Sequence, residues 1–397
     1  MDLVLVLLQL PATMMVAYLV ILSCAALNGG RRVAPASPRS RIALLIPAHN
    51  EEVLLPRLLE SIAALEYPRH LYDVHVVADN CVDDTASRAA AGGAVVHERR
   101  DEAQRGKGYA LQWLLGRVSR GGRNYDGYVI LDADSVVSQN FLTVMNRHLL
   151  RGDQAVQSYY GVLNQSDSWS SGLRYAALAL FNHLRPRGRD ALGLSAGLRG
   201  NGMCFTSAVM ERFGWQAFTL AEDAEFHLHL VEAGVRVRYA AEASVLAEMP
   251  TSLRGARTQN VRWERGRLQL VRQFGPRLIG RGLLQHDPVR LDAVGEQLVP
   301  PLSVLTGLTV LAFVVTGILH RIGPLSLASL VLLGEIVYVM AGLWMVRAGP
   351  RIYLAFLGSP IYVAWKLWIY MVSAVGIRDA RWIRTARSAQ DMERSRR

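Results

Sequence analysis

The chain has 397 residues, 51% of them hydrophobic, and its 44 Lys and Arg residues against 33 Asp and Glu residues give a formal net charge of +11. This length and hydrophobic content allow one domain of ordinary size together with membrane segments. The basic residues concentrate near the apolar segments and in the tail, where anionic lipid accounts for them, so we expect no nucleic-acid partner. Three scattered cysteines, Cys24, Cys81 and Cys204, have neither the spacing of a zinc site nor that of a disulfide framework, which favours a reducing compartment.

Residues 1–30 predict an uncleaved transmembrane helix. No charged residue occurs between Leu3 and Asn28, a stretch too long for the core of a signal peptide, and no basic segment precedes it. Arg31 and Arg32 follow directly and mark the cytoplasmic end of this helix.

Residues 40–255 predict a cytosolic α/β domain with a Rossmann-like, mostly parallel sheet. Short runs rich in β-branched residues, such as RIALLIPA and DVHVVADN, end in turn residues, and helical patterns such as EEVLLPRLLESIAAL lie between them. Strands that alternate with helices in this way form a sheet that is covered on both faces.

The membrane region begins after a basic segment with interfacial helices at residues 256–296. Within residues 297–376, the runs Leu298–Leu319 and Ile322–Val346 are long and apolar enough to span a membrane. Glu335 lies inside the second run, where a carboxyl group is costly unless it faces protein or water. It contacts a polar acceptor, or it is protonated, or the helix is shifted toward an interface.

A third apolar run, Ile352–Val375, contains Pro360 and Lys366. If this run crossed the membrane, the basic tail at residues 377–397 would lie outside, against the preference for basic flanks in the cytoplasm. We therefore predict three spanning helices followed by an interfacial or re-entrant segment and a cytoplasmic tail, with four spanning helices as the alternative.

Two acidic motifs in the α/β region follow apolar runs. Asp132 and Asp134 of the sequence VILDADS lie two residues apart, so in an extended chain both carboxylates point to the same side. At the carboxyl end of a parallel strand, two such oxygen ligands suit Mg²⁺ or Mn²⁺ holding a diphosphate, whereas the alternative is a solvated turn. Asp79 ends an earlier run and is placed to accept hydrogen bonds from a base or ribose.

Two basic segments lie in the same region. Lys107 stands between two glycines, which permit a close backbone approach, and its ammonium group supplies a point charge for phosphate. The spacing is not that of a P-loop. Arg185, Arg187 and Arg189 predict either a plain solvated loop or a mobile basic loop beside the active site.

A third acidic pair precedes a helical pattern. Glu222 and Asp223 lie at the start of the sequence EDAEFHLHLVEAG. Acidic residues at a helix start are common because they interact favourably with the helix dipole. In a domain with a metal and diphosphate site, however, a further carboxylate is also what the activation of a sugar hydroxyl requires.

Together, these motifs resemble those of the membrane-bound family 2 glycosyltransferases, a group that includes the cellulose, chitin, hyaluronan and poly-N-acetylglucosamine synthases. The resemblance covers roughly residues 40–270 and is carried by seven collinear motifs: IPAHNEE, VVADNCVDDT, RGKG, DAD, LRGNGMCF, LAEDAEF and QNVRW. It implies a GT-A fold that binds a nucleotide sugar, usually a UDP-sugar, together with Mg²⁺ or Mn²⁺, and that inverts the anomeric centre.

The resemblance also implies roles for individual residues. The donor-binding set is Glu51, Asp79, Lys107, Asp132, Gln259, Arg262 and Trp263, and the metal ligands are Asp132 and Asp134. The acceptor-side set is Gly200, Asn201, Gly202, Phe205 and Trp263. The catalytic set is Asp223, which resembles the general base, and its neighbour Glu222.

The resulting hypothesis is an inverting, metal-dependent transferase that moves a sugar from a nucleotide-sugar donor to a glycan or lipid-linked acceptor. We expect a multi-pass protein of the inner (plasma) membrane with a cytoplasmic catalytic domain that serves polysaccharide or glycolipid synthesis, with partner subunits supplying any export path. The alternative is a membrane-anchored nucleotide-sugar sensor without activity, which would have no need of an acceptor base at Asp223.

Overall fold

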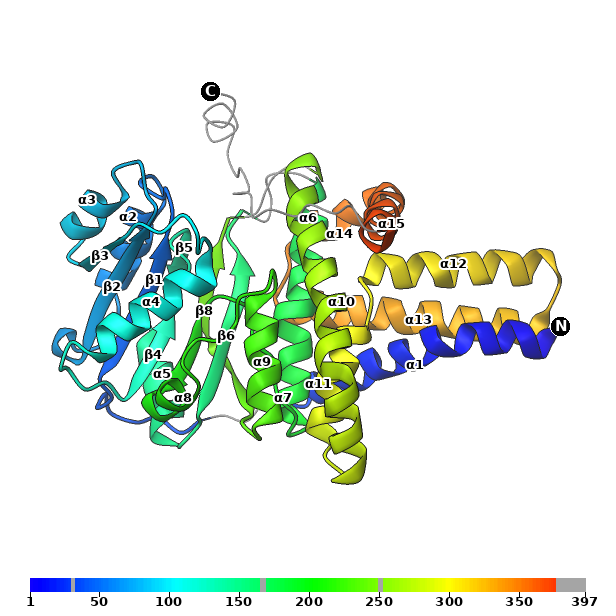
Figure 1. The fold of residues 1–397 in the computed structure, drawn as a ribbon. Helices are drawn as coiled ribbons and strands as arrows, with labels where there is room; N and C mark the ends of the chain where they lie inside the picture. Colours follow the sequence, from blue (N-terminus) through cyan, green and yellow to red (C-terminus); the bar gives the residue numbers. More distant parts are fainter. Residues whose placement is uncertain (30–32, 165–168, 249–252, 376–397) are drawn as a thin grey trace.

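The computed structural model describes residues 1–29, 33–164, 169–248 and 253–375. An α/β domain forms one end of the molecule, and three helices project from its other end (Figure 1). The predicted combination of an α/β domain with apolar helices is therefore confirmed. Arg31, Arg32 and the tail at residues 377–397 lie outside the described residues.

The described part of the α/β domain contains an eight-stranded sheet of order β3-β2-β1-β4-β7-β6-β8-β5. Parallel pairs join β1 to β2 and β4, β2 to β3, and β6 to β8. Antiparallel pairs join β7 to β4 and β6, and β5 to β8, so the sheet is mixed beyond β4. The strands are β1 (Ile42–Ala48), β2 (Tyr72–Asp79), β3 (Val95–Arg99), β4 (Gly127–Ile130), β5 (Ser135–Val137), β6 (Ala155–Val162), β7 (Met203–Thr206) and β8 (Val237–Ala247).

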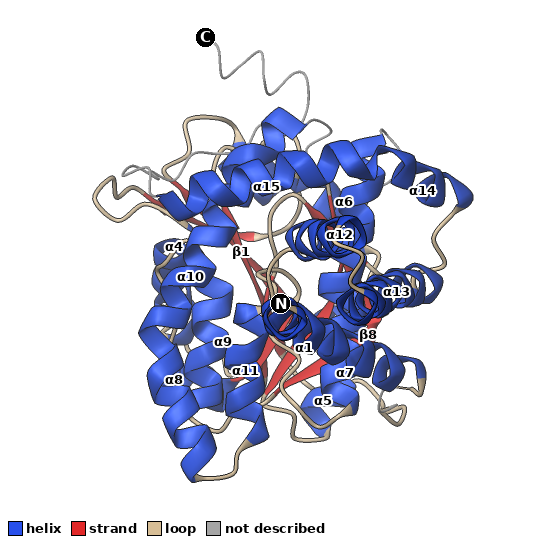
Figure 2. Cartoon of the chain, turned by 90° about the vertical axis from the view of Figure 1, so that its right-hand side faces the viewer, coloured by secondary structure: helices blue, strands red, loops and turns tan. Residues whose placement is uncertain are grey.

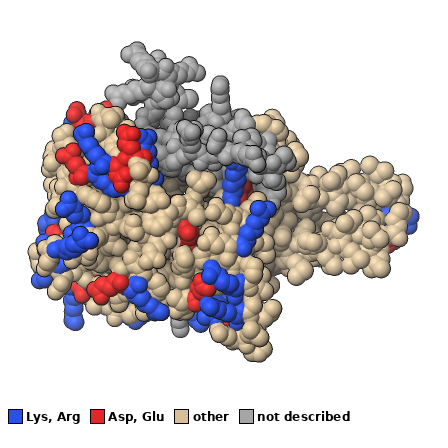
Figure 3. All heavy atoms as spheres, in the orientation of Figure 1, with Lys and Arg blue, Asp and Glu red and all other residues tan. Residues whose placement is uncertain are grey.

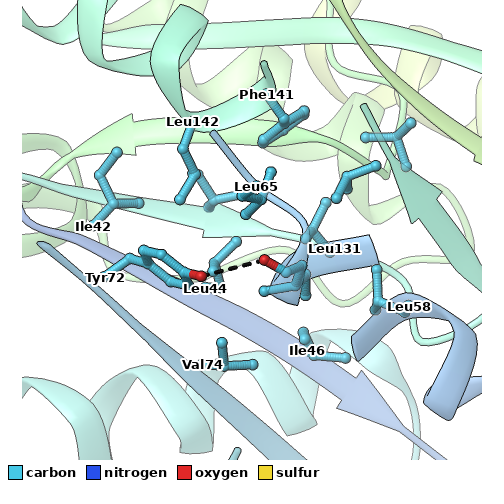
Figure 4. Packing of buried hydrophobic residues seen from close by; sticks show 14 of the residues in the cluster. Ile42, Leu44, Ile46, Leu58, Leu65, Tyr72, Val74, Leu131, Phe141 and Leu142 are labelled. Atoms are coloured by element: carbon cyan, nitrogen blue, oxygen red, sulfur yellow. Dashed lines mark hydrogen bonds between the residues drawn. The ribbon is translucent and has the colours of Figure 1, made fainter. Parts of the chain in front are cut away.

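Helices cover both faces of this sheet, as the alternation of side chains along β1 requires. Ile42, Leu44 and Ile46 belong to one hydrophobic cluster, whereas Ala43 and Leu45 belong to the cluster on the other face. The first cluster is closed by α2 (Leu55–Ala63), α3 (Thr85–Ala91) and α5 (Phe141–Leu150), and Figure 4 shows its packing. The second is closed by α4 (Lys107–Ser119), α8 (Ser207–Phe213) and α9 (Glu222–Glu232).

The projecting helices are α1 (Asp2–Leu27), α12 (Leu302–Ile318) and α13 (Ile322–Met345), which lie side by side (Figures 1 and 2). Among the described residues, α1 and α13 are long and apolar enough to cross a membrane. A third crossing is counted if α11 (Pro288–Leu298) and α12, which meet at a bend of 72°, form one span.

The bend corrects the predicted start of the apolar run Leu298–Leu319. The run was expected to begin as a helix at Leu298, but α11 ends there and α12 begins at Leu302. Pro300 and Pro301 lie between them, and proline lacks the backbone N–H that a continuous helix would use.

Glu335 faces protein inside the bundle. Its Oε2 accepts a hydrogen bond from the Thr306 hydroxyl at 2.5 Å, and its Oε1 accepts one from Thr309 at 2.9 Å. The side chain is buried, so these bonds link α13 to α12 and replace the water that the carboxyl group loses.

The third apolar run forms α14 (Pro350–Ala355) and α15 (Ser359–Val375). In Figure 2, the projecting helices are seen end-on and α15 runs roughly perpendicular to them, and it contacts α12 and α10 (Leu253–Leu284). This orientation favours an interfacial segment over a fourth span, and that assignment stays a prediction.

The predicted loop at Arg185, Arg187 and Arg189 is wrong. Residues Arg185–Ala191 form helix α7, which follows α6 (Trp169–Ala179) and one wider turn, and both Arg185 and Arg189 are buried. Their carboxylate partners lie on α11, about a hundred residues later in the chain, so the local sequence held no sign of the burial.

Candidate active site

Lys107 lies at the point where four segments of the α/β domain meet. It is the first residue of α4, and Gly106 before it has a φ of +117°, a conformation that side chains rarely allow. Its Nζ lies 2.6 Å from Asp132 Oδ1 and 3.7 Å from Glu222 Oε1, and it donates to the Gly200 carbonyl oxygen at 2.5 Å. One ammonium group therefore joins the predicted phosphate, metal, acceptor and catalytic motifs.

The DAD motif lies in a turn that follows β4. The strand ends at Ile130, so the strand alternation expected from the sequence does not reach Asp134. Ala133 is instead buried in the core, and the half-buried Asp132 and Asp134 flank it. The backbone N–H of Asp132 donates to Asn201 Oδ1 at 3.1 Å, which fixes the turn against the acceptor-side segment.

Two glycines shape this acceptor-side segment. Gly200 and Gly202 have φ values of +81° and +68°. A Cβ atom on Gly200 would lie 3.3 Å from Asp223 Oδ2, and one on Gly202 would lie 2.0 Å from Ser158 Oγ. The backbone at Gly200 thus lies directly against the Asp223 carboxylate, where a Cβ atom would make an unusually tight contact.

Two predicted acceptor contacts need correction. Phe205 is fully buried, with its ring centroid 5.3 Å from that of Phe226 in the core, so it supports the segment from beneath and does not reach an acceptor. Asn201 is also fully buried, and its side chain bonds to Asp132 N and Ser135 Oγ. The LRGNGMCF motif runs directly into strand β7, which contains Phe205. This apolar strand pattern is the signal in the sequence that could have predicted burial at the end of the motif.

We predict that Asn201→Ala lowers the free energy of unfolding by about 2 kcal/mol or more, because it leaves the Asp132 N–H unpaired and removes the hydrogen bond that Ser135 Oγ accepts inside the domain. The measurement is the denaturant midpoint of the full chain in detergent. Asn140→Ala is the matched control, at a half-buried side chain that donates to the Glu242 carbonyl oxygen and accepts from Ser138 Oγ, and it should cost less. Equal losses in the two variants would contradict the assigned role of Asn201.

Glu222 and Asp223 form the first turn of α9. Burial raises the pKa of Glu222 to about 7, although the neighbouring Lys107 ammonium opposes this shift. Burial likewise raises the pKa of Asp223, against the backbone N–H of Ala224 and the positive charge of Lys107. Because the two carboxyl groups interact, they titrate as a pair.

At the same edge of the sheet, Asp79 ends β2 in a buried ion pair. Its Oδ1 lies 2.6 Å from Arg99 NH1, and Arg99 NH2 lies 3.0 Å from Asp101 Oδ2. Burial raises the pKa of Asp79, whereas Arg99 opposes the rise. The sequence argument missed Arg99, although it ends β3, the neighbouring parallel strand. Glu51 lies in the loop after β1, where its N–H donates to Thr85 Oγ1 at 2.8 Å.

Helix α10 carries the QNVRW motif past the start of α9. A Cβ atom on Gly266 would lie 2.7 Å from the Cβ of Ala221, the residue before Glu222. Trp263, about one helical turn earlier, is 39% exposed and is therefore free to contact a ligand. The side chains of Gln259 and Arg262 lie outside the described residues.

Comparison with known proteins follows the same motifs. Residues 38–266 match the family model described as "Glycosyltransferase like family 2". The beta-monoglucosyldiacylglycerol synthase of Nostoc sp. is 29% identical over 199 residues, which cover 48% of this chain and 41% of that protein. The poly-beta-1,6-N-acetyl-D-glucosamine synthase of Staphylococcus aureus is 24% identical over 249 residues, which cover 59% and 56%. The matches thus span about half the length of these relatives.

Among solved structures, the mannosyltransferase PcManGT from Pyrobaculum calidifontis, in complex with GDP-Man and Mn²⁺, is similar over 94% of this chain and 97% of its own, with a TM-score of 0.56 and 17% identity. At this identity the likeness concerns the fold. It confirms the predicted GT-A architecture, with apolar helices attached.

Proposed function

Because the chain belongs to glycosyltransferase family 2, we propose that it transfers a sugar from a nucleotide-sugar donor to a hydroxyl group of an acceptor at the membrane surface. The observation that carries this proposal is the convergence of Lys107, Asp132, the Gly200 carbonyl and the Glu222–Asp223 pair within one site. A phosphate-binding cation, acidic metal ligands and a buried base are the groups that a direct displacement of a nucleoside diphosphate requires.

On the donor side, Lys107 supplies positive charge where the leaving diphosphate develops negative charge. Its ammonium group is held by Asp132 and the Gly200 carbonyl oxygen, so it is oriented and partly dehydrated by the protein itself. Preorganised charge of this kind stabilises a transition state more than mobile, hydrated charge does. Asp79 and Glu51, at the ends of neighbouring parallel strands, are assigned to the nucleoside.

The donor set also fits a divalent metal. Among the described residues, no group of three or more His, Cys, Asp or Glu side chains gathers to hold an ion. Mg²⁺, however, commonly takes only one or two protein carboxylates and completes its shell with phosphate and water oxygens. Asp132 and Asp134 would hold Mg²⁺ or Mn²⁺, which supplies further positive charge to the diphosphate.

On the acceptor side, Asp223 is assigned as the general base. It lies against Gly200, where no side chain separates it from the Lys107 site. A single displacement with inversion needs one base to accept the proton of the attacking hydroxyl group, and no covalent intermediate. Glu222, beside Lys107, is placed to hold that ammonium group in position.

The raised pKa of Asp223 leads to a prediction about pH. The base acts when ionised, so the rate falls as the pH drops through its raised folded-state pKa, at a higher pH than for an exposed Asp. We expect kcat to decline about tenfold per unit of pH below that point. The measurement is kcat across neutral and acidic pH. Glu222→Gln should move this acid limb to lower pH, because it removes a like charge, and an unmoved limb would contradict the pairing.

We also assign the site to a membrane protein. The apolar residues of α1, α12 and α13 are widely exposed on a part of the surface where charged side chains are almost absent from the visible face (Figure 3). These helices support a multi-pass protein of the plasma membrane whose α/β domain lies in the cytoplasm. The named activities of the relatives favour a glycolipid or polysaccharide acceptor, with partner subunits for any export.

The test is a donor screen with the full chain in detergent or lipid nanodiscs. With Mn²⁺ present, one nucleotide sugar should yield nucleoside diphosphate, and mass spectrometry should find its sugar on a glycan or lipid. Binding of a donor without any turnover, across UDP- and GDP-sugars and both acceptor classes, would favour the sensor alternative.

A further inference from the structure

Buried ion pairs join the α/β domain to the helix that leads into the bundle. Helices α7 and α11 meet at the base of the helical bundle (Figure 1). Arg189 is fully buried, and its Nε donates to Asp292 Oδ2 at 2.7 Å. Glu296, which is 3% exposed, accepts a hydrogen bond from Arg199 NH2 at 3.1 Å and lies 3.8 Å from Arg185 NH1. Buried charges of this kind depend on their partners, because an unpaired one is strongly unfavourable.

Of these two carboxylates, Glu296 is the one that bonds directly to the residue before Gly200. Its partner Arg199 directly precedes Gly200, whose carbonyl oxygen holds Lys107 and whose Cα faces Asp223. Asp292 connects elsewhere, since its Oδ1 accepts a hydrogen bond from the Tyr18 hydroxyl of α1 at 2.8 Å.

The Arg199 guanidinium and the backbone around it are held from several sides. Its carbon Cζ lies 3.9 Å from the centroid of the Phe181 ring. Glu296 supplies the carboxylate partner of the same guanidinium. The backbone N–H of Arg199 donates to Gln157 Oε1 at 2.8 Å, and Gln157 Nε2 donates to the Asn201 carbonyl oxygen at 2.7 Å. The backbone is thus fixed by β6, whereas the side chain is fixed by α11.

Arg199 also acts on the base through its charge. Burial raises the pKa of Asp223, and the positive charge of Arg199 lowers it, as that of Lys107 does. The charged and titratable groups that face Asp223 among the described residues are Glu222 on its own helix, Lys107 on α4, Asp132 after β4, Tyr160 on β6 and Arg199 before β7. Of these, only Arg199 is held by a residue outside the α/β domain.

We propose that Glu296 is a positioning residue for the transfer reaction: it holds the Arg199 guanidinium beside the backbone that carries Gly200, and through that charge it sets the electrostatic field at Asp223. This inference rests on the proposed function. Under this proposal, α11 contributes to the transfer reaction in addition to joining two parts of the chain. Because α11 is followed, after the Pro300–Pro301 bend, by α12, Glu296 lies where the α/β domain joins the apolar helices.

The experiment is a double-mutant cycle on kcat, with Glu296→Gln and Arg199→Gln in the full chain. Each single variant should lower kcat about 10- to 100-fold, because small misplacements of reacting groups carry costs of that size. The double variant should be no slower than the slower single variant, because both remove the same link. Asp292→Asn is the matched control on α11, and its effect should multiply with that of Arg199→Gln.

The pH profile separates positioning from mere loss of folded protein. Arg199→Gln should move the acid limb of kcat to higher pH by about one unit, whereas Arg199→Lys, which keeps the charge, should leave the limb in place. Glu296→Asp should recover part of the lost rate. Thermal unfolding of each variant in detergent gives its folded fraction. A decrease in kcat that this fraction fully accounts for would reflect lost stability and not lost positioning.

The outcomes are distinct. Wild-type turnover together with multiplicative effects of Glu296→Gln and Arg199→Gln would overturn this inference and leave the proposed function standing. An acid limb that does not move in Arg199→Gln would do the same. A wild-type chain that releases no nucleoside diphosphate from any donor would overturn both.

Discussion

Asp223→Asn is expected to lower kcat for sugar transfer about 1,000-fold, since an amide has the shape of the carboxylate but cannot accept the proton of the attacking hydroxyl group. The Asp223 side chain lies against Gly200, on the acceptor side of Lys107. Donor affinity should therefore remain close to that of the wild type. The measurements are nucleoside diphosphate release with acceptor present and equilibrium binding of the donor.

The matched control is Glu222→Gln, one residue away in the same turn of α9. Glu222 lies 3.7 Å from Lys107 and is therefore proposed to hold the ammonium group. Glu222→Gln should lower kcat clearly less than Asp223→Asn does, and it should weaken donor binding as well. A reversed order, with Glu222→Gln inactive and Asp223→Asn active, would assign the base to Glu222. Loss of donor binding in Asp223→Asn would instead place Asp223 on the donor side.

Much of the α/β domain was predictable because its information is local. The alternation of Ile42, Leu44 and Ile46 along β1 identifies a strand covered on both faces, and the motifs that follow such strands gather at one edge. The family and the GT-A fold were predicted from the collinear motifs for the same reason, and both are confirmed.

What the sequence could not show depends on pairs far apart in the chain. Arg199 and Glu296 are 97 residues apart, and Arg185 and Arg189 resembled loop residues until α11 supplied their carboxylates. The antiparallel course of β7 was also hidden, because hydrophobic alternation carries no sign of strand direction. Phe205 was misplaced because its burial follows from its position in β7 and not from the motif.

The alternation argument placed Asp132 and Asp134 in an extended strand, and that geometry is wrong. A turn, and not an extended strand, separates the two carboxylates, and the buried methyl group of Ala133 keeps both away from the core. What the motif could not reveal is that Asp132 is already paired with Lys107 at 2.6 Å. The proposed metal ligand and the proposed phosphate-binding cation therefore form an ion pair with each other.

That pairing sharpens the prediction for metal removal. Treatment with EDTA should lower nucleoside diphosphate release about 100-fold or more, and added Mg²⁺ or Mn²⁺ should restore it. Asp132→Asn should lower kcat by a similar factor and should also weaken Mn²⁺ binding, measured by electron paramagnetic resonance with the donor present. Asp101→Asn is the control, because this acid pairs with Arg99 at the same sheet edge but is assigned no metal. Full activity in EDTA would remove the metal from the mechanism, and Asp132 would then act by holding Lys107 alone. In that case Lys107→Met should cancel the effect of Asp132→Asn, because the two residues would form one functional pair.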